Sequence, residues 1–215
     1  MDLARLIDHT LLKPYCTLAD VEEVCREAAE YRFAAVCLPP YYVKDACKLL
    51  EGHPVKVATV IGFPMGYSAV AAKVEEIKRA VDEGADELDA VINLCAVKNG
   101  KWNYVKSEIE SLSTACHMKG RLIKTIIESG VLNEDELVKI AEICAGAGVD
   151  YVKTSTGINA PGASVEVVAK LRELLPQEIK IKASGGIRDR AFAEQLVGAG
   201  ASRLGSSSGI QIVSG

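Results

Sequence analysis

Three observations predict an α/β protein built on parallel strands. Short apolar runs alternate with amphipathic stretches from one end of the 215-residue chain to the other. Hydrophobic residues make up 49% of the chain and aromatic residues only 5%, which favours close-packed strands and helices over a sandwich with aromatic cross-strand pairs. Gly84, Gly148 and Gly200 each precede an apolar run at the end of a helical pattern, as expected of repeated strand–helix units.

Eight strands are expected from the apolar runs, which are bounded by turn residues. They cover residues 6–11, 34–38, 56–61, 87–93, 122–128, 151–155, 179–184 and 203–206. Helical periodicity fills the intervals at 18–31, 41–50, 69–82, 101–118, 134–146, 164–175 and 189–198. Thr17 and Asp20 predict a capping box for the first helix, and Asn133 and Ser164 are expected to cap two later helices.

Eight strand–helix units in about this length indicate a (β/α)8 barrel, a TIM barrel, formed as a single domain over residues 1–215. The alternative is an open, doubly wound sheet. A G-x-G-x-x-G fingerprint after a first strand is absent, which argues against the dinucleotide-binding form of that alternative. No Pro-, Gly- or Ser-rich linker divides the chain, so no second domain is expected.

Charge and cysteine usage narrow the class of partner and the compartment. The net charge of −4 comes from 29 acidic and 25 basic residues without a basic stripe, so no nucleic-acid partner is expected. The seven cysteines are odd in number, scattered and without a C-x-x-C pair, which is typical of reduced thiols in a cytoplasmic protein. No membrane-length apolar run, secretory signal or metal-binding histidine spacing occurs.

Lys153 and Lys182 are the most informative residues for function, because each lies inside a short apolar run typical of a buried strand. Burial removes hydration from an ammonium group, and two lysines on neighbouring strands repel each other, so both effects lower the pKa of an amine. An amine that is neutral near pH 7 can attack a carbonyl and form a Schiff base. The alternative, equally weighted on strand context alone, is that both side chains reach solvent at strand ends.

Side-chain alternation along the strands predicts one charged cluster inside the barrel. Five residues occupy positions that can share the interior: Asp8, Asp89, Lys124, Lys153 and Lys182. Two acids and three bases in a dry cavity are coupled and costly, and proteins tolerate such clusters mainly at active sites. The alternative is a set of buried salt bridges that only stabilises the barrel.

Two loops of small residues predict an anion site. One comprises residues 183–188 and the other residues 203–209, and each follows one of the last two strands. Small residues let backbone N–H groups approach an anion, and the loops after the seventh and eighth strands are a recurrent phosphate site in barrels. A Gly-Gly pair alone is more often a plain turn, so the prediction depends on the two loops occurring together.

Six segments resemble deoxyribose-phosphate aldolase, a family of class I aldolases with the (β/α)8 fold. The segments are residues 6–14, 60–64, 84–93, 124–129, 150–157 and 181–188. The resemblance implies reversible cleavage of 2-deoxy-D-ribose 5-phosphate to D-glyceraldehyde 3-phosphate and acetaldehyde through a lysine Schiff base, without a metal or organic cofactor. Two alternatives stay open: a Schiff-base barrel aldolase for a different phosphosugar or keto acid, and a phosphosugar-binding barrel or isomerase that forms no covalent bond.

The resemblance also implies roles for individual residues. Lys153 matches the Schiff-base lysine, Lys182 the lysine that perturbs it, and Asp89 the acid–base aspartate. The remaining matches are to phosphate loops and polar residues lining the substrate site: Gly185, Gly186, Gly205 and Ser207 in the loops, with Asp8 and Lys124 in the lining. The resemblance further implies a small-molecule phosphosugar substrate and a homo-oligomer, either a dimer or a tetramer.

The sequence departs from the family pattern in three places. Ile158 stands where some members place a phosphate-contacting lysine, and Pro39 stands where an asparagine is common. The chain also stops soon after the eighth expected strand. These departures bear on the strength of phosphate selectivity and leave the expected covalent chemistry unchanged.

Overall fold

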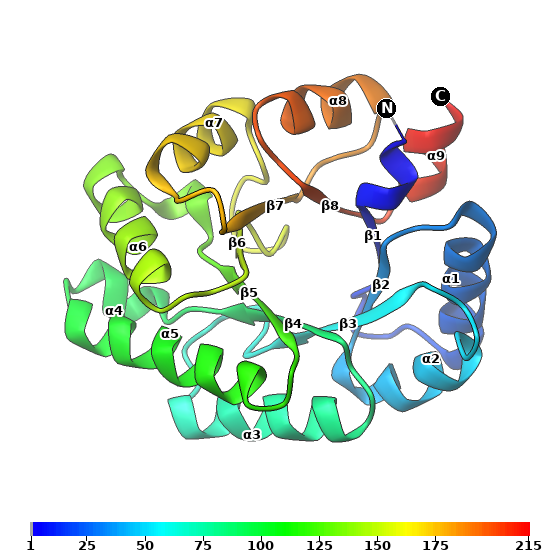
Figure 1. Ribbon diagram of the computed structural model, residues 1–215, viewed down its shortest axis with the longest axis horizontal. Helices are drawn as coiled ribbons and strands as arrows, with labels where there is room; N and C mark the ends of the chain where they lie inside the picture. The colour runs from blue at the N-terminus through cyan, green and yellow to red at the C-terminus, as the bar shows by residue number, and fades with distance from the viewer. Residues whose placement is uncertain (1) are drawn as a thin grey trace.

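The computed structural model describes residues 2–215 and confirms the barrel, a closed ring of eight parallel strands (Figure 1). In chain order the strands are β1 (Ile7–Thr10), β2 (Ala35–Leu38), β3 (Lys56–Ile61), β4 (Glu87–Val91), β5 (Leu122–Ile126), β6 (Tyr151–Lys153), β7 (Lys180–Ser184) and β8 (Arg203–Ser206). Each strand pairs with its sequence neighbours, and β8 closes the ring by pairing in parallel with β1, with Asp8 opposite Gly205. An open doubly wound sheet is therefore ruled out.

Helices surround the barrel on its outer side (Figure 1). The longer ones are α1 (Leu18–Tyr31), α2 (Val43–Leu49), α3 (Val70–Asp82), α5 (Trp102–His117), α6 (Glu134–Gly146), α7 (Val165–Leu174) and α8 (Arg190–Gly198). The predicted capping box is present at α1, where the Thr17 N–H donates to the Asp20 carboxylate at 2.6 Å and the Asp20 N–H donates to the Thr17 hydroxyl. Asn133 and Ser164 cap α6 and α7, as predicted.

Short elements account for most differences from the sequence prediction. Helices α4 (Leu94–Lys98) and α9 (Gly209–Ser214) were not predicted, nor were the 3-10 turns at Leu3–Leu6 and Ser129–Val131. Segments of this length are too short to show helical periodicity. The helix predicted over 41–50 is divided into a 3-10 turn, Pro40–Tyr42, and α2. Strand β4 also ends at Val91, two residues earlier than predicted, because the Asn93 side chain accepts the Ala96 N–H and begins α4.

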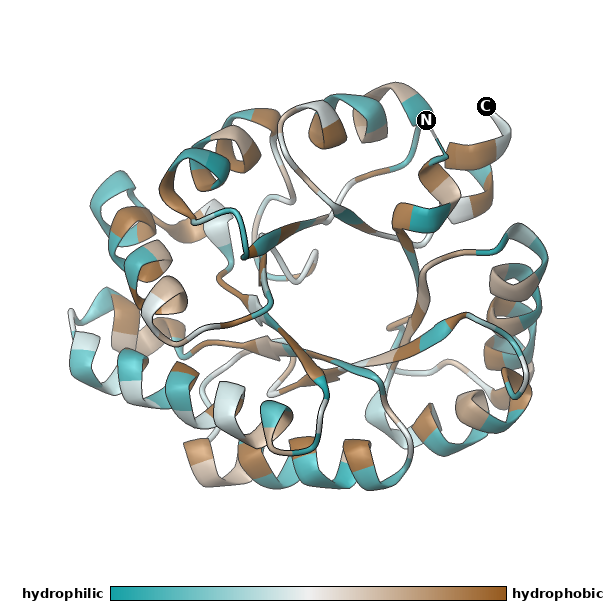
Figure 2. Cartoon of the chain, viewed as in Figure 1, coloured by the Kyte–Doolittle hydropathy of each residue, from teal (hydrophilic) through white to brown (hydrophobic). Residues whose placement is uncertain are grey.

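The main apolar core lies between the strands and the helices. Its strand residues include Val36, Leu88, Ile123, Val152, Ile181 and Leu204, all with no exposed surface. The helices are banded in brown and teal along their length, as expected of amphipathic helices with one face on the barrel (Figure 2). A separate apolar cluster of Ala35, Cys37, Ala58 and Val60 comes from alternate positions of β2 and β3, so this side of the barrel interior is apolar.

The two ends of the chain meet on one side of the barrel. The turn Leu3–Leu6 contacts α9, so the first and last described elements of the chain lie side by side (Figure 1). This contact covers the point where the ring of strands closes. No helix in residues 2–215 is long and apolar enough to cross a membrane.

Candidate active site

The five ionisable residues predicted to share the interior are buried there. Asp8, Asp89, Lys124 and Lys182 have no exposed surface, and Lys153 is 3% exposed. Alternation along parallel strands turns these side chains inward, and adjacent strands of a barrel contribute to different layers of the interior. The alternative in which Lys153 and Lys182 reach solvent at strand ends is therefore wrong.

Asp89 lies at the centre of this group and binds all three lysines. Its Oδ2 accepts hydrogen bonds from Lys153 Nζ at 2.8 Å and from Lys182 Nζ at 2.7 Å. Its Oδ1 accepts one from Lys124 Nζ at 2.8 Å. Lys182 also donates to Asp8. Lys182 thus has two carboxylate partners, whereas Lys153 shares its one carboxylate with two other amines.

Because their carboxylate partners differ, the pKa values of the two amines are shifted in opposite directions. Burial lowers the pKa of Lys153, and repulsion from Lys182 lowers it further against the opposing effect of Asp89. Burial also opposes the charge on Lys182, but Asp8 and Asp89 together raise the pKa of Lys182 above its ordinary value. The expectation of a lowered pKa is therefore wrong for Lys182, because the sequence did not reveal its contact with Asp8. Lys153 is the amine suited to be neutral, beside a charged Lys182.

The two aspartates stay ionised although they are buried. Burial opposes ionisation of Asp8, but Lys182, Lys124 and Arg203 hold the pKa of Asp8 far below its ordinary value. The three lysines lower the pKa of Asp89 in the same way. Burial instead raises the pKa of the Cys37 thiol, whose Sγ lies 4.0 Å from Asp89 Oδ2. A neutral thiol therefore faces the carboxylate from β2.

Glu87 and Arg203 extend the cluster toward the N-terminal ends of the strands. Neither was among the predicted site residues. Glu87 forms an ion pair with Lys124 Nζ at 2.6 Å and accepts a hydrogen bond from Arg203 Nη1 at 3.0 Å. Arg203 also donates to Asp8 Oδ1 at 2.6 Å, and its Nη2 lies 3.5 Å from the Tyr151 hydroxyl. Alternation did place Glu87 on the same strand face as Asp89. No sequence signal indicated that Arg203, the first residue of a four-residue strand, turns inward.

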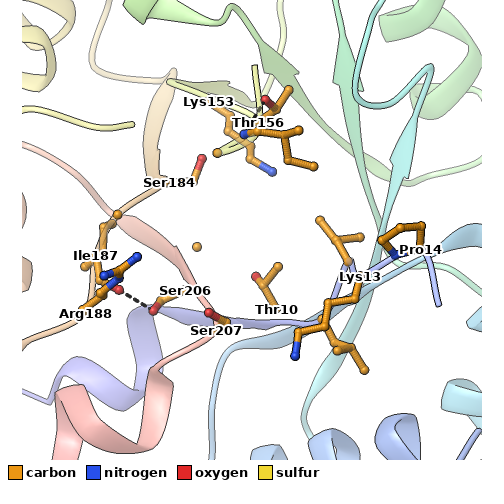
Figure 3. A pocket seen from close by; sticks show the side chains of 17 residues that line it. Thr10, Lys13, Pro14, Lys153, Thr156, Ser184, Ile187, Arg188, Ser206 and Ser207 are labelled. Atoms are coloured by element: carbon orange, nitrogen blue, oxygen red, sulfur yellow. Dashed lines mark hydrogen bonds between the residues drawn. The ribbon is translucent and has the colours of Figure 1, made fainter. Parts of the chain in front are cut away.

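An open cavity of about 450 Å³ lies at the C-terminal ends of the strands (Figure 3). Lys153 points into it from β6, while Arg188 and Lys13 lie on opposite sides of it (Figure 3). The lining includes the predicted loop residues Gly185, Gly186, Gly205 and Ser207. Asp8 and Lys124 were expected in the lining of the substrate site. Like Asp89 and Lys182, they are fully buried and lie outside this lining, two residues before the ends of their strands.

Two of the lining glycines are needed for different reasons. Gly186 has a φ of +79° with open space around its Cα, so its left-handed backbone alone favours glycine. At Gly205 an added Cβ would lie 3.0 Å from Ser184 Cβ and 3.1 Å from Lys182 Cε. Gly205 therefore leaves room for the Lys182 side chain in addition to lining the cavity, a role that the sequence did not suggest.

Cationic side chains in the cavity wall were missed as site residues. Lys13 follows β1, and Arg188 ends the Gly-Gly loop after β7; both are exposed in the lining. Ile158, which is 57% exposed, belongs to the same lining. The arrangement suits an anionic group held between two cations and several backbone amides. Among residues 2–215, no group of three His, Cys, Asp or Glu side chains is placed to hold a metal ion.

Residues 3–215 match the family model described as DeoC/LacD family aldolase. The chain belongs to this family. Curated DeoC/LacD relatives include a deoxyribose-phosphate aldolase of Desulfitobacterium hafniense, 50% identical over 213 residues, with 99% of this chain and 98% of the relative covered. The deoxyribose-phosphate aldolase of Thermococcus gammatolerans is 48% identical over 217 residues, with 100% and 96% covered. The resemblance seen in the sequence motifs is confirmed.

Solved structures of DeoC/LacD aldolases agree in fold. A putative deoxyribose-phosphate aldolase from Coccidioides immitis superimposes with a TM-score of 0.95 at 41% identity, covering 99% of this chain and 85% of that one. The tetrameric deoxyribose phosphate aldolase from Aeropyrum pernix gives a TM-score of 0.93 at 35% identity, covering 99% and 89%. The barrel and its closure are therefore shared along almost the whole chain.

Proposed function

We propose that this DeoC/LacD aldolase reversibly cleaves 2-deoxy-D-ribose 5-phosphate to D-glyceraldehyde 3-phosphate and acetaldehyde. The observation that carries the proposal is the buried amine of Lys153, which opens into the cavity and shares Asp89 with Lys182. The curated relatives are named as deoxyribose-phosphate aldolases over nearly their whole length, which supports the same substrate here.

Lys153 is the proposed nucleophile. Its neutral amine attacks the C1 aldehyde of the open-chain sugar, and loss of water gives an iminium. The C2–C3 bond then breaks, and its electron pair moves into the iminium to form an enamine. The C3 hydroxyl loses its proton and leaves as the aldehyde of D-glyceraldehyde 3-phosphate. Protonation of the enamine at C2 and hydrolysis of the imine release acetaldehyde and restore the amine.

Asp89 and Lys182 are the proposed proton-transfer pair. Asp89 Oδ2 is hydrogen-bonded to both Lys153 and Lys182, so this carboxylate connects the nucleophile to a charged amine that can donate a proton. General acid–base groups need this kind of hydrogen-bond reach to the reacting atoms. Lys182 also keeps a positive charge beside Lys153, which favours the unprotonated nucleophile.

The phosphate is proposed to bind in the part of the cavity formed by the β7 and β8 loops. Gly185, Gly186, Gly205 and Ser207 supply backbone amides and a hydroxyl there, and Arg188 adds a cation from the same loop. Lys13 lies across the cavity from Arg188 (Figure 3). Since Ile158 supplies no charge, these groups provide most of the binding to the phosphate.

The substrate assignment is tested by measuring the aldehyde and keto-acid products released from a panel of phosphosugars and keto acids. We expect 2-deoxy-D-ribose 5-phosphate to have the highest kcat/KM in the panel, and plain 2-deoxy-D-ribose to react with a higher KM. A higher kcat/KM for a different phosphosugar or for a keto acid would overturn the substrate assignment. A matched control is Lys170→Met, a substitution on the outer surface of α7, which should leave the ranking unchanged.

We further propose a cytoplasmic homo-oligomer. The seven cysteines are unpaired within residues 2–215, which suits a reducing compartment. The related Aeropyrum pernix enzyme is described as a tetramer, which supports a dimer or tetramer here. Light scattering of the purified protein should give a mass of two or four chains, and a monomer mass at micromolar concentration would contradict the proposal.

A further inference from the structure

Seven buried or nearly buried ionisable residues form one continuous network of ion pairs inside the barrel. We refer to it as the interior charge cluster: Asp8, Glu87, Asp89, Lys124, Lys153, Lys182 and Arg203. It contains three acids and four bases. If all seven were ionised, the cluster would carry one net positive charge in a water-poor interior, which is costly. With Lys153 as a free amine, the cluster is neutral.

We propose that Glu87 and Arg203, which do not reach the cavity, are positioning residues that set the protonation state of Lys153 from the side of the cluster away from the cavity. This inference rests on the proposed function, since it assigns the two residues a role in preparing the Schiff-base amine. They act through their charge and through the ion pairs that they form with Asp8 and Lys124, and they do not contact the reacting atoms.

The contacts show how this control reaches Lys153. Arg203 binds Asp8 Oδ1 at 2.6 Å, which leaves Asp8 Oδ2 to Lys182. Glu87 binds Lys124 Nζ at 2.6 Å, so Asp89 is not the only strong partner of Lys124. Lys182 and Lys124 in turn hold Asp89, the one carboxylate that contacts Lys153. Removing the charge of Glu87 or Arg203 therefore changes the net charge that surrounds the amine of Lys153.

The charge count predicts opposite effects for the two residues. Without Arg203, three acids face three lysines, so the cluster is neutral only when Lys153 is protonated, and the amine should lose its proton at higher pH. Without the charge of Glu87, two acids face four bases, so Lys153 should lose its proton at lower pH. A purely structural pair would weaken the protein in both cases without moving the protonation in opposite directions.

Apart from the exposed Lys180, the other groups around this interior do not supply a competing charge. The β2 side presents the thiol of Cys37, whose pKa is raised by burial, and the β3 side presents the apolar Ala58 and Val60. The Tyr151 ring on β6 lies against Arg203, and Lys180 Nζ on β7 lies 5.6 Å from that ring. The charged groups on β1, β4, β5, β6, β7 and β8 are the seven cluster members together with Lys180.

The test compares Arg203→Met, Glu87→Gln and the double variant. The rate at which acetaldehyde and borohydride alkylate Lys153 is measured against pH, alongside kcat/KM for 2-deoxy-D-ribose 5-phosphate. The acid limb of both profiles should move up by at least about one pH unit in Arg203→Met and down by a similar amount in Glu87→Gln. The double variant restores the balance of charge and should return close to the wild-type limb.

Two further variants separate charge from packing. Arg203→Lys keeps the positive charge and should keep the wild-type acid limb even where its thermal stability falls. Arg190→Met removes an exposed arginine that pairs with Glu194 on α8 and should leave both profiles unchanged. Because Glu87→Gln retains the side-chain volume and does not contain the Arg203 substitution, the test does not depend on the folding of Arg203→Met alone.

Limbs that stay in place, or that move in the same direction in both single variants, would overturn the proposal. That outcome is distinct from a failure of the proposed function. If Lys153 is not the Schiff-base residue, the wild-type protein itself will not be alkylated at Lys153, whatever the variants do.

Discussion

Replacing Lys182 with methionine should make Lys153 harder to deprotonate. Both amines contact Asp89 Oδ2, at 2.7 and 2.8 Å, so the two nitrogens lie no more than 5.5 Å apart, the sum of those distances. Two unit charges at that separation repel by about 3 kcal/mol at an effective dielectric constant of about 20. Since one pKa unit corresponds to about 1.4 kcal/mol, the pKa of Lys153 should rise by about two units.

The Lys182→Met variant should therefore contain about 100-fold less free amine than the wild type at any pH well below the wild-type pKa of Lys153. The measurement is the pH dependence of kcat/KM, whose acid limb reports the amine of the free enzyme. We expect this limb to move up by about two pH units. At high pH the variant should recover part of its activity, limited by the loss of Lys182 in proton transfer.

The variant should still fold, because Asp8 keeps its contact with Arg203 and Asp89 keeps Lys124 and Lys153. Lys139→Met, on the exposed surface of α6, is the matched control and should behave like wild type. An acid limb that stays in place in Lys182→Met would refute the conclusion that repulsion between the two amines lowers the pKa of Lys153.

Four other substitutions test separate features of the site. Lys153→Met should abolish turnover without lowering the thermal midpoint at pH 7. A lysine whose pKa is lowered in the folded protein binds its proton less well there than in the unfolded chain, so it reduces stability until the pH passes about 10.4. A clear fall in the midpoint would contradict this prediction. Gly205→Ala should reduce kcat more than it raises KM, since the added Cβ meets Lys182 Cε at 3.1 Å, whereas a pure KM effect would assign Gly205 to phosphate binding alone. Arg188→Gln should raise KM for the phosphorylated sugar about 10-fold or more and Ile158→Lys should lower it with greater salt sensitivity, while equal effects on plain 2-deoxy-D-ribose would place the phosphate elsewhere.

The barrel was predictable from the sequence because each strand–helix unit carries its own signal. Buried strands such as Tyr151–Lys153 are apolar runs, and helices such as α1 show both amphipathic periodicity and a capping box. The helices α4 and α9 were missed because five or six residues are too few for a periodic pattern. The ends of β1, β4, β5 and β6 were also placed one or two residues too far along the chain, since a strand and the loop after it can have the same composition.

The interior cluster was predictable in part. Alternation from Asp89 and Lys153 identified the inward faces of β4 and β6, and the same rule turned Lys124 and Lys182 inward. The rule cannot say which groups pair across the barrel, because the pairing of Asp8 with Lys182 depends on ring closure between residues 174 positions apart. Arg203 was missed because nothing in the four-residue strand β8 indicated that its first residue turns inward. The lowered pKa expected for Lys182 was wrong because the contact of Lys182 with Asp8 was not foreseen.

Reductive trapping of the intermediate is the direct test of whether Lys153 forms the Schiff base. The protein is incubated with acetaldehyde, reduced with borohydride, digested and examined by mass spectrometry, with Lys182→Met and Lys153→Met treated in parallel. We expect an ethyl group on Lys153 in the wild-type protein, none at that position in Lys153→Met, and slower labelling of Lys153 in Lys182→Met at neutral pH. An ethyl group on Lys182 or Lys124 in place of Lys153, or no stable adduct on any lysine, would contradict this expectation.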